Sequence, residues 1–201
     1  MKKSITITAS LFAFALMSFA PKHSEVYKVD TKLSSSEWFG EKLTGKHNGT
    51  ILFSSGEIKD DHGALTGKFE VDMTSIVNKD LEGESKTKLE NHLKSPDFFD
   101  VAKFPKATFV VTSITPIKDA KEGAMTHTVK GNLTIKEKTN PISFDAVIKT
   151  EAGKIACVGT TTVDRTKFDV KYGSKAFFPE IGDKMIYDEF KVKFNVVAVK
   201  Q

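Results

Sequence analysis

The chain has 201 residues, of which 39% are hydrophobic and 28% are charged, so one ordinary domain with a core is expected and a wholly disordered chain is excluded. Its single cysteine, Cys157, excludes an intrachain disulfide framework and every metal site built from several cysteines. Without Lys2 and Lys3, which lie in the leader described next, 28 basic residues face 26 acidic ones, and a net charge of +2 is too small to predict nucleic-acid binding.

The first residues have the pattern of a secretory signal peptide. Met1-Lys2-Lys3 is basic, Ile5 to Ala20 carry no charge, and Ser18 and Ala20 place small residues where a signal peptidase cleaves. The uncharged run is shorter than the roughly 20 residues of an ordinary transmembrane helix. We therefore expect residues 1–20 to be cleaved and residues 21–201 to form a periplasmic or secreted domain. Because proline is unfavourable directly after a cleavage site, Pro21 leaves the exact cleavage position undetermined. The alternative interpretation of residues 1–20 is a buried strand or a retained anchor.

Apolar and polar residues alternate along most of residues 21–201, which is typical of strands with one buried face. Turn pairs such as His62-Gly63, Asn140-Pro141 and Ala152-Gly153 lie between the alternating runs. The pattern predicts about eight antiparallel strands joined by short turns. In chain order, the runs are Ser34–Trp38, Gly49–Phe53, Phe69–Met73, Phe109–Ser113, Val129–Ile135, Ile142–Ile148, Cys157–Val163 and Phe190–Ala198.

The alternation stops between Lys79 and Phe99. Leu89 and Leu93 are four residues apart among polar neighbours, which predicts a short amphipathic helix. Ser95-Pro96 predicts the start of a second helix, with serine as the cap and proline at the first helical position. One or two short helices are therefore expected within a single all-β domain.

Eight antiparallel strands form either a sandwich or a closed barrel. A sandwich packs its two inner faces together, whereas an eight-stranded barrel can hold one small ligand. The inward positions carry large apolar residues, a few glycines and almost no ionisable group, so a barrel built from them is apolar and either filled or hollow. The predicted wall consists of Trp38, Ile51, Phe53, Phe69, Val71, Met73, Phe109, Val111, Leu133, Ile135, Phe144, Ile148, Phe190, Val192 and Phe194.

Four segments resemble motifs of the YceI-like family, in the order in which the family has them. The first is His-Leu-Lys-Ser-Pro-Asp-Phe-Phe-Asp at 92–100, and the second is Lys-Phe-Pro-Lys-Ala-Thr-Phe at 103–109. Gly-Asn-Leu-Thr-Ile at 131–135, followed by Pro141, resembles the third, and Val-Asp-Arg at 163–165 with Phe168 resembles the fourth. Together the four segments indicate this family more specifically than any one of them.

The resemblance implies an eight-stranded antiparallel lipocalin-like β-barrel over residues 21–201 that holds an amphiphile with a long isoprenoid or acyl tail. It implies no cofactor other than such a bound lipid, for example a polyprenyl compound or an isoprenoid quinone. The sequence departs from the family pattern at Glu137, where many members have glycine, and in a long approach to the last strand from Phe177 to Asp188. These departures affect the rim of the barrel more than its fold.

Two charged or titratable residues of the motifs each have a binding and a structural interpretation. His92 either touches a ligand's head group at the pocket mouth or is a helix histidine hydrogen-bonded to the backbone or to an aspartate. Arg165 either binds an anionic head group or fixes one barrel end through a carboxylate such as Asp100 or Asp188. The structural interpretation is favoured for both.

Three further side chains are candidates for a role at the pocket: two phenylalanines with two possible roles and one cysteine. Phe98 and Phe99 are either a lid over the pocket or a plug that fills one end of the barrel. Cys157 is interpreted as a small buried hydrophobe, because a reactive thiol needs an accessible, electropositive setting.

The function predicted from these features is an exported binding protein that sequesters or carries such a lipid. The alternatives are an enzyme that uses His92 as acid or base on that lipid, and a filled barrel with a stress-related role and no ligand. No nucleophile–base arrangement or metal-ligand spacing is recognisable, so we expect neither catalysis nor a metal. The expected partners are a small hydrophobic or amphiphilic ligand and, transiently, a membrane. The head group, the tail length and the oligomeric state, a dimer included, stay open.

Overall fold

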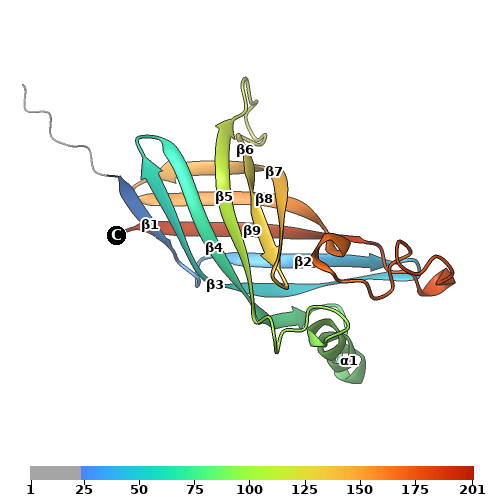
Figure 1. Cartoon of the computed structure of the whole chain (residues 1–201). Helices are drawn as coiled ribbons and strands as arrows, with labels where there is room; N and C mark the ends of the chain where they lie inside the picture. The colour runs from blue at the N-terminus through green and yellow to red at the C-terminus, as the bar shows by residue number, and fades with distance from the viewer. Residues whose placement is uncertain (1–23) are drawn as a thin grey trace, which may run out of the picture.

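The computed structural model describes residues 24–201, so the expected signal peptide and its cleavage site lie outside the described residues. These residues form nine strands, the α-helix α1 (Gly83–Lys94) and the 3-10 helices η1 (Arg165–Phe168) and η2 (Gly182–Lys184). All nine strands belong to one antiparallel sheet (Figure 1). They are β1 (Glu25–Val29), β2 (Ser35–Lys42), β3 (Gly45–Asp61), β4 (Ala64–Asn78), β5 (Lys106–Pro116), β6 (His127–Ile135), β7 (Lys138–Glu151), β8 (Lys154–Asp164) and β9 (Glu189–Lys200).

The sheet closes into a barrel through the pairing of β3 with β4. Strands β1 and β2 share one position in this barrel, because both lie between β3 and β9 at different heights. Nine strands thus fill eight positions, and the predicted eight-stranded antiparallel lipocalin-like barrel is confirmed. The sequence pattern missed β1, whose five residues give too short an alternation to stand out.

The barrel interior is largely apolar, because every second residue of a strand faces inward and most residues at these positions are apolar. One end is closed by a cluster of Tyr27, Ile58, Ile155 and Ala198, all of them buried. At the other end, a second cluster joins the strand residues Met73, Ile135 and Val163 to Phe168 of η1.

Inward glycines let aromatic rings lie against the barrel wall. A Cβ atom on Gly49 would lie 1.9 Å from the Val77 carbonyl oxygen and 2.7 Å from the ring of Trp38 on the neighbouring strand. A Cβ atom on Gly159 would lie 2.8 Å from the ring of Phe194. These separations are shorter than a van der Waals contact. The close approach of ring to backbone requires glycine and draws these large side chains toward the wall.

The predicted helix around Leu89 and Leu93 is confirmed as α1, none of whose residues is fully buried. The second helix predicted at Ser95-Pro96 is wrong, because residues 95–103 form turns. The amides of Phe98 and Asp100 both donate to the carbonyl of Ser95, and Asp100 has a φ of 47°, which no right-handed helix accommodates. Within the described residues, no helix is long and apolar enough to span a bilayer.

A polar cluster fastens α1 to the barrel through Glu90. Asn78 is fully buried; its amide N–H donates to Glu90 Oε1 of α1 at 2.8 Å, and its Nδ2 donates to Asp80 Oδ1 at 2.7 Å. Asp80 also accepts from the backbone N–H of Asn48 and pairs with His47, each at 2.8 Å. Partial burial acts to raise the pKa of Asp80, but these hydrogen bonds outweigh it and hold the pKa below its ordinary value.

The long segment between η1 and β9, residues 169–188, lies at the same end of the barrel as α1 (Figure 1). It attaches to the end of β2, where Leu43 donates its amide to the Met185 carbonyl at 3.1 Å and Tyr187 donates to the Glu41 carbonyl at 3.0 Å. We call α1, residues 95–104, residues 169–188 and the β2–β3 turn the open end of the barrel.

Candidate functional site

A cavity of about 620 Å³ occupies the barrel interior. Each of the strands β2 to β9 contributes apolar side chains to its lining, and α1 adds Leu89 and Leu93. The volume lies within the range of roughly 300–1,000 Å³ found for small-molecule sites. The barrel is therefore hollow. The types of the inward residues alone were compatible with either a filled or a hollow interior.

The cavity reaches solvent at the open end. Residues of the β2–β3 turn and of the loop around η2 line it there, among them the exposed Lys42, Thr44, Asp183 and Lys184. At the opposite end the lining includes Ile58 and Ile155 of the buried cluster around Tyr27, Leu65, which packs against that cluster, and the neighbouring Thr66 and Gly67. The cavity is thus a pouch with a polar mouth and a largely apolar bottom.

The structure places all 19 of the predicted site residues in the lining of this one cavity. Their contact with a ligand stays a prediction. They are Trp38, Ile51, Phe53, Phe69, Val71, Met73, His92, Phe98, Phe99, Phe109, Val111, Leu133, Ile135, Phe144, Ile148, Arg165, Phe190, Val192 and Phe194.

Sequence reasoning missed three kinds of lining residue. Some, such as Thr161 and Val196, have the same parity as the predicted wall and were within reach of the alternation argument. Ile58 and Ile114 follow β-bulges in β3 and β5, where the extra residue reverses the parity. Tyr172, Ile186 and Tyr187 lie in residues 169–188, where no periodic pattern indicates which side chains turn inward.

Aromatic rings follow one another around the wall. The ring centroids of Phe109 and Phe144 are 5.7 Å apart, and those of Phe144 and Phe194 are 5.3 Å apart. Such contacts stabilise a pair by about 0.5–1.5 kcal/mol beyond simple burial. The rings therefore form a fixed wall that presents apolar surface to whatever enters.

Cys157 is part of this wall, and its thiol is unpaired. Burial raises the pKa of this thiol to about 11. At neutral pH it is a protonated apolar group, in agreement with the interpretation of Cys157 as a small buried hydrophobe.

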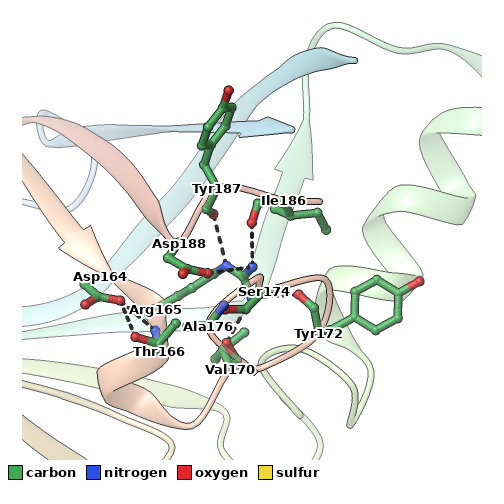
Figure 2. A network of polar contacts seen from close by, with 10 residues as sticks. All are labelled: Asp164, Arg165, Thr166, Val170, Tyr172, Ser174, Ala176, Ile186, Tyr187 and Asp188. Atoms are coloured by element: carbon green, nitrogen blue, oxygen red, sulfur yellow. Dashed lines mark hydrogen bonds and ion pairs between the residues drawn. The ribbon is translucent and has the colours of Figure 1, made fainter. Parts of the chain in front are cut away.

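Arg165 holds the open end together (Figure 2). Its side chain is only 2% exposed and has five N–H donors. Four of them bond to backbone carbonyls: Nε to Tyr187, Nη1 to Val170 and Tyr172, and Nη2 to Ile186, at 2.8–3.2 Å. Nη2 also lies 3.2 Å from Asp188 Oδ1.

This use of the donors favours the structural role of Arg165 over the head-group role. Burial lowers the pKa of the guanidinium, while Asp188 and Asp164 act in the opposite direction. Asp188, one of the two acids considered from the sequence, supplies the carboxylate. The guanidinium carbon also lies 5.5 Å from the centroid of the Phe98 ring, so that Phe98 and Arg165 stabilise each other's position.

His92 is held by rings. Its imidazole lies edge-to-face with Tyr172, with centroids 4.4 Å apart, and contacts Phe98 at 5.9 Å. Its Nε2, like Trp38 Nε1 and Thr161 Oγ1, is covered by neighbouring atoms and has no hydrogen-bond partner among residues 24–201. The polar tips of these lining residues are thus withdrawn from the cavity surface.

Phe98 is buried between His92, Phe99 and Arg165, and Phe99 contacts Phe190 of β9. These contacts favour the plug over the lid for Phe98. In the part of the chain that the structure describes, no group of three or more His, Cys, Asp or Glu residues is arranged to hold a metal ion.

Three solved structures resemble this chain. Burkholderia cenocepacia BcnA matches with a TM-score of 0.65 at 23% identity, over 85% of this chain and 99% of BcnA. A polyisoprenoid binding domain from Saccharophagus degradans, implicated in plant cell wall breakdown, matches with a TM-score of 0.62 at 14% identity, over 87% of this chain and 98% of that domain. The Campylobacter jejuni YCEI protein matches with a TM-score of 0.51 at 18% identity, over 100% and 99% of the two chains. At these identities the likenesses establish the fold alone.

Sequence comparison identifies the family. A UPF0312 protein of Pseudomonas putida strain W619 is 30% identical over 177 residues, which are 83% of this chain and 87% of that relative. The family model described as the YceI-like domain matches residues 19–198. Together with the barrel and the four motifs, this match shows that the chain belongs to the YceI-like family.

Proposed function

We propose that this protein is an exported binding protein that holds one amphiphile with a long isoprenoid or acyl tail in its barrel. The observation that carries the proposal is the cavity of about 620 Å³, apolar along the barrel, closed at one end and polar at its mouth. Such a shape suits a molecule with an apolar tail and one polar end. The description of the Saccharophagus degradans neighbour as a polyisoprenoid binding domain supports the ligand class.

Burial of the tail provides the driving force. Each CH₂ group that leaves water gains about 0.8 kcal/mol, while association costs about 4–15 kcal/mol in total. A tail must therefore exceed a minimum length to bind at all. This requirement selects long-tailed lipids over short ones without any specific polar contact.

Export is the second part of the proposal. A basic start, an uncharged run and small residues before position 21 support a cleaved signal peptide, and with it a periplasmic or secreted location. A lipid with a long tail does not dissolve in such an aqueous compartment. A protein with an apolar pouch would carry it there.

Binding without turnover is favoured over an enzyme that acts on the same lipid. His92 is the acid or base that an enzyme would use, but its Nε2 is covered by other atoms. The Cys157 thiol, with a pKa of about 11, is a poor nucleophile at neutral pH. The chemistry available at the cavity surface is therefore burial of apolar groups.

Mass spectrometry of an organic extract tests the proposal. The protein is purified without detergent from cells that express the full chain. A variant with Phe144→Glu serves as the comparison, because an apolar tail in the cavity would strip water from the unpaired charge and so bind poorly. We expect one long-tailed lipid per wild-type molecule, chemically unchanged after incubation, and none from the variant. A clean wild-type extract, together with no change in melting temperature on adding polyprenols or fatty acids, would contradict the proposal.

A further inference from the structure

Large hydrophobic side chains gather on the outside of the open end. Leu43, Tyr172, Phe177, Phe178 and Tyr187 are 41–51% exposed, and we call these five residues the rim patch. They are half of the ten large hydrophobic residues that are this exposed within residues 24–201. Single exposed apolar residues are common on protein surfaces, but a cluster at one end marks an interaction surface.

The rim patch is fixed to the barrel. Arg165 binds the carbonyls of Tyr172 and Tyr187, and Figure 2 shows both rings directed away from the guanidinium. The amides of Phe177 and Phe178 donate to the carbonyl of the fully buried Ser174 at 3.2 and 2.9 Å. The backbone that carries these rings is thus held in place in the folded state, so docking needs little reordering of the chain.

The rim patch is continuous with the cavity. Tyr172 and Tyr187 line the mouth of the cavity and are also exposed to solvent. Leu43 adjoins Lys42, another residue of the mouth, and is joined to Met185 by a backbone hydrogen bond. The rim patch therefore meets the mouth of the cavity at Tyr172 and Tyr187, beside the polar residues that also line the mouth.

We propose that the rim patch docks on the surface of a phospholipid bilayer, with the mouth of the cavity facing the lipid. This inference rests on the proposed function: a long tail that passes through water exposes its whole apolar surface, whereas a docked mouth receives it directly. Phenylalanine and leucine insert into the boundary between head groups and acyl chains, and tyrosine is favoured there because its ring is apolar and its hydroxyl polar.

The charges around the rim patch are balanced. Residues 41–46 and 169–189 carry five exposed lysines and five exposed acids: Lys42, Lys46, Lys171, Lys175 and Lys184, and Glu41, Asp169, Glu180, Asp183 and Glu189. A strongly basic rim would select anionic lipids. The balanced rim fits zwitterionic head groups, so ring insertion and not electrostatic attraction accounts for docking.

Co-sedimentation with phosphatidylcholine vesicles tests the proposal. The variant Phe177→Ser/Phe178→Ser removes two exposed rings, and Val110→Thr/Val158→Thr, on the outside of β5 and β8, is the matched control. We expect the double phenylalanine variant to lose at least about tenfold in vesicle binding, the control to lose less than about twofold, and high salt to have little effect. Wild-type sedimentation that is absent, or equal in both variants, would overturn the proposal.

A second measurement separates this proposal from the proposed function. Wild type and the Phe177→Ser/Phe178→Ser variant are loaded with a polyprenol delivered from cyclodextrin, without any bilayer, and equal loading is expected. Sedimentation without loading would support docking and overturn the lipid cavity; loading without sedimentation would do the reverse. A dimer that the phenylalanine substitutions dissolve, without vesicle binding, would assign the rim patch to a second copy of the chain and overturn docking.

Discussion

The two ends of the barrel are built on different principles. At the closed end, strand residues alone seal the interior: Tyr27, Ile58, Ile155 and Ala198 are at most 5% exposed. At the open end, a helix with no fully buried residue, a run of turns and a long loop cover the strands, held by a buried arginine. The closed end is built as a regular core of strand residues. The open end, where a ligand would enter, is built instead from a helix, turns and a loop.

The largest effect is expected where the open end depends on a single side chain. Arg165→Met keeps the volume but leaves four carbonyls without their donor and Asp188 without its counter-charge. We expect a loss of about 3–5 kcal/mol in the free energy of unfolding, measured in urea, and faster proteolysis within residues 169–188. Lys167→Met, at a side chain that is 62% exposed, is the control. A loss below about 1 kcal/mol would show that the hydrogen bonds and ion pair of Arg165 contribute little to stability.

A slightly smaller effect is expected for Phe98→Ala, which distinguishes a plug from a lid. Because Phe98 is 7% exposed and packs against Arg165 and His92, its removal should cost about 3 kcal/mol, at the lower end of the range for buried phenylalanine. Denaturation and the dissociation rate of a bound lipid are measured together. A nearly unchanged free energy of unfolding with a much faster dissociation rate would instead identify a lid.

The closed end is tested by Ile155→Ala, which deepens the pouch. Ile155 is 1% exposed and lines the bottom of the cavity, so a loss of about 2–3 kcal/mol in stability is expected. The added space should also shift the preferred tail to a longer chain by one or two carbons, measured by competition between lipids. An unchanged preference would mean that the bottom of the pouch does not set the tail length.

The smallest effect concerns pH. The folded state holds the pKa of Asp80 below its ordinary value of 3.8, so Asp80 contributes stability that is present above pH 3.8 and is lost as the pH falls through the lower folded pKa. The difference in unfolding free energy between wild type and Asp80→Asn should therefore shrink in acid. It is measured by urea unfolding at pH 7 and below pH 3.8. A difference that stays constant with pH would contradict the role of the carboxylate.

The strands of the barrel could be predicted from the sequence in more detail than the open end could. Alternation located the strands and placed residues such as Phe144 and Val192 on the wall, because a two-residue period has only two faces. After a β-bulge the inward side chains change from one set of alternate positions to the other. The alternation pattern does not show this change, so Ile58 and Ile114 were not predicted to face inward. Bulges arise from pairing between strands and leave no mark in a single strand's pattern.

The open end was predictable only in outline. Ser95-Pro96 is a good helix start, but the amides of Phe98 and Asp100 both bond to the Ser95 carbonyl and close turns there, and Asp100 has left-handed backbone. Arg165 was assigned two candidate carboxylates, and only the path of residues 169–188 brings Asp188 to it. Contacts between distant, non-periodic segments have no local signature.

The central claim is that an apolar tail fills the pouch, and the direct test is the dependence of affinity on tail length. Dissociation constants are measured for a series of amphiphiles that share one head group and differ by single CH₂ groups. The account predicts that affinity rises about fourfold for each added CH₂ and then levels off once the cavity is full. Affinities that do not change with tail length would contradict it.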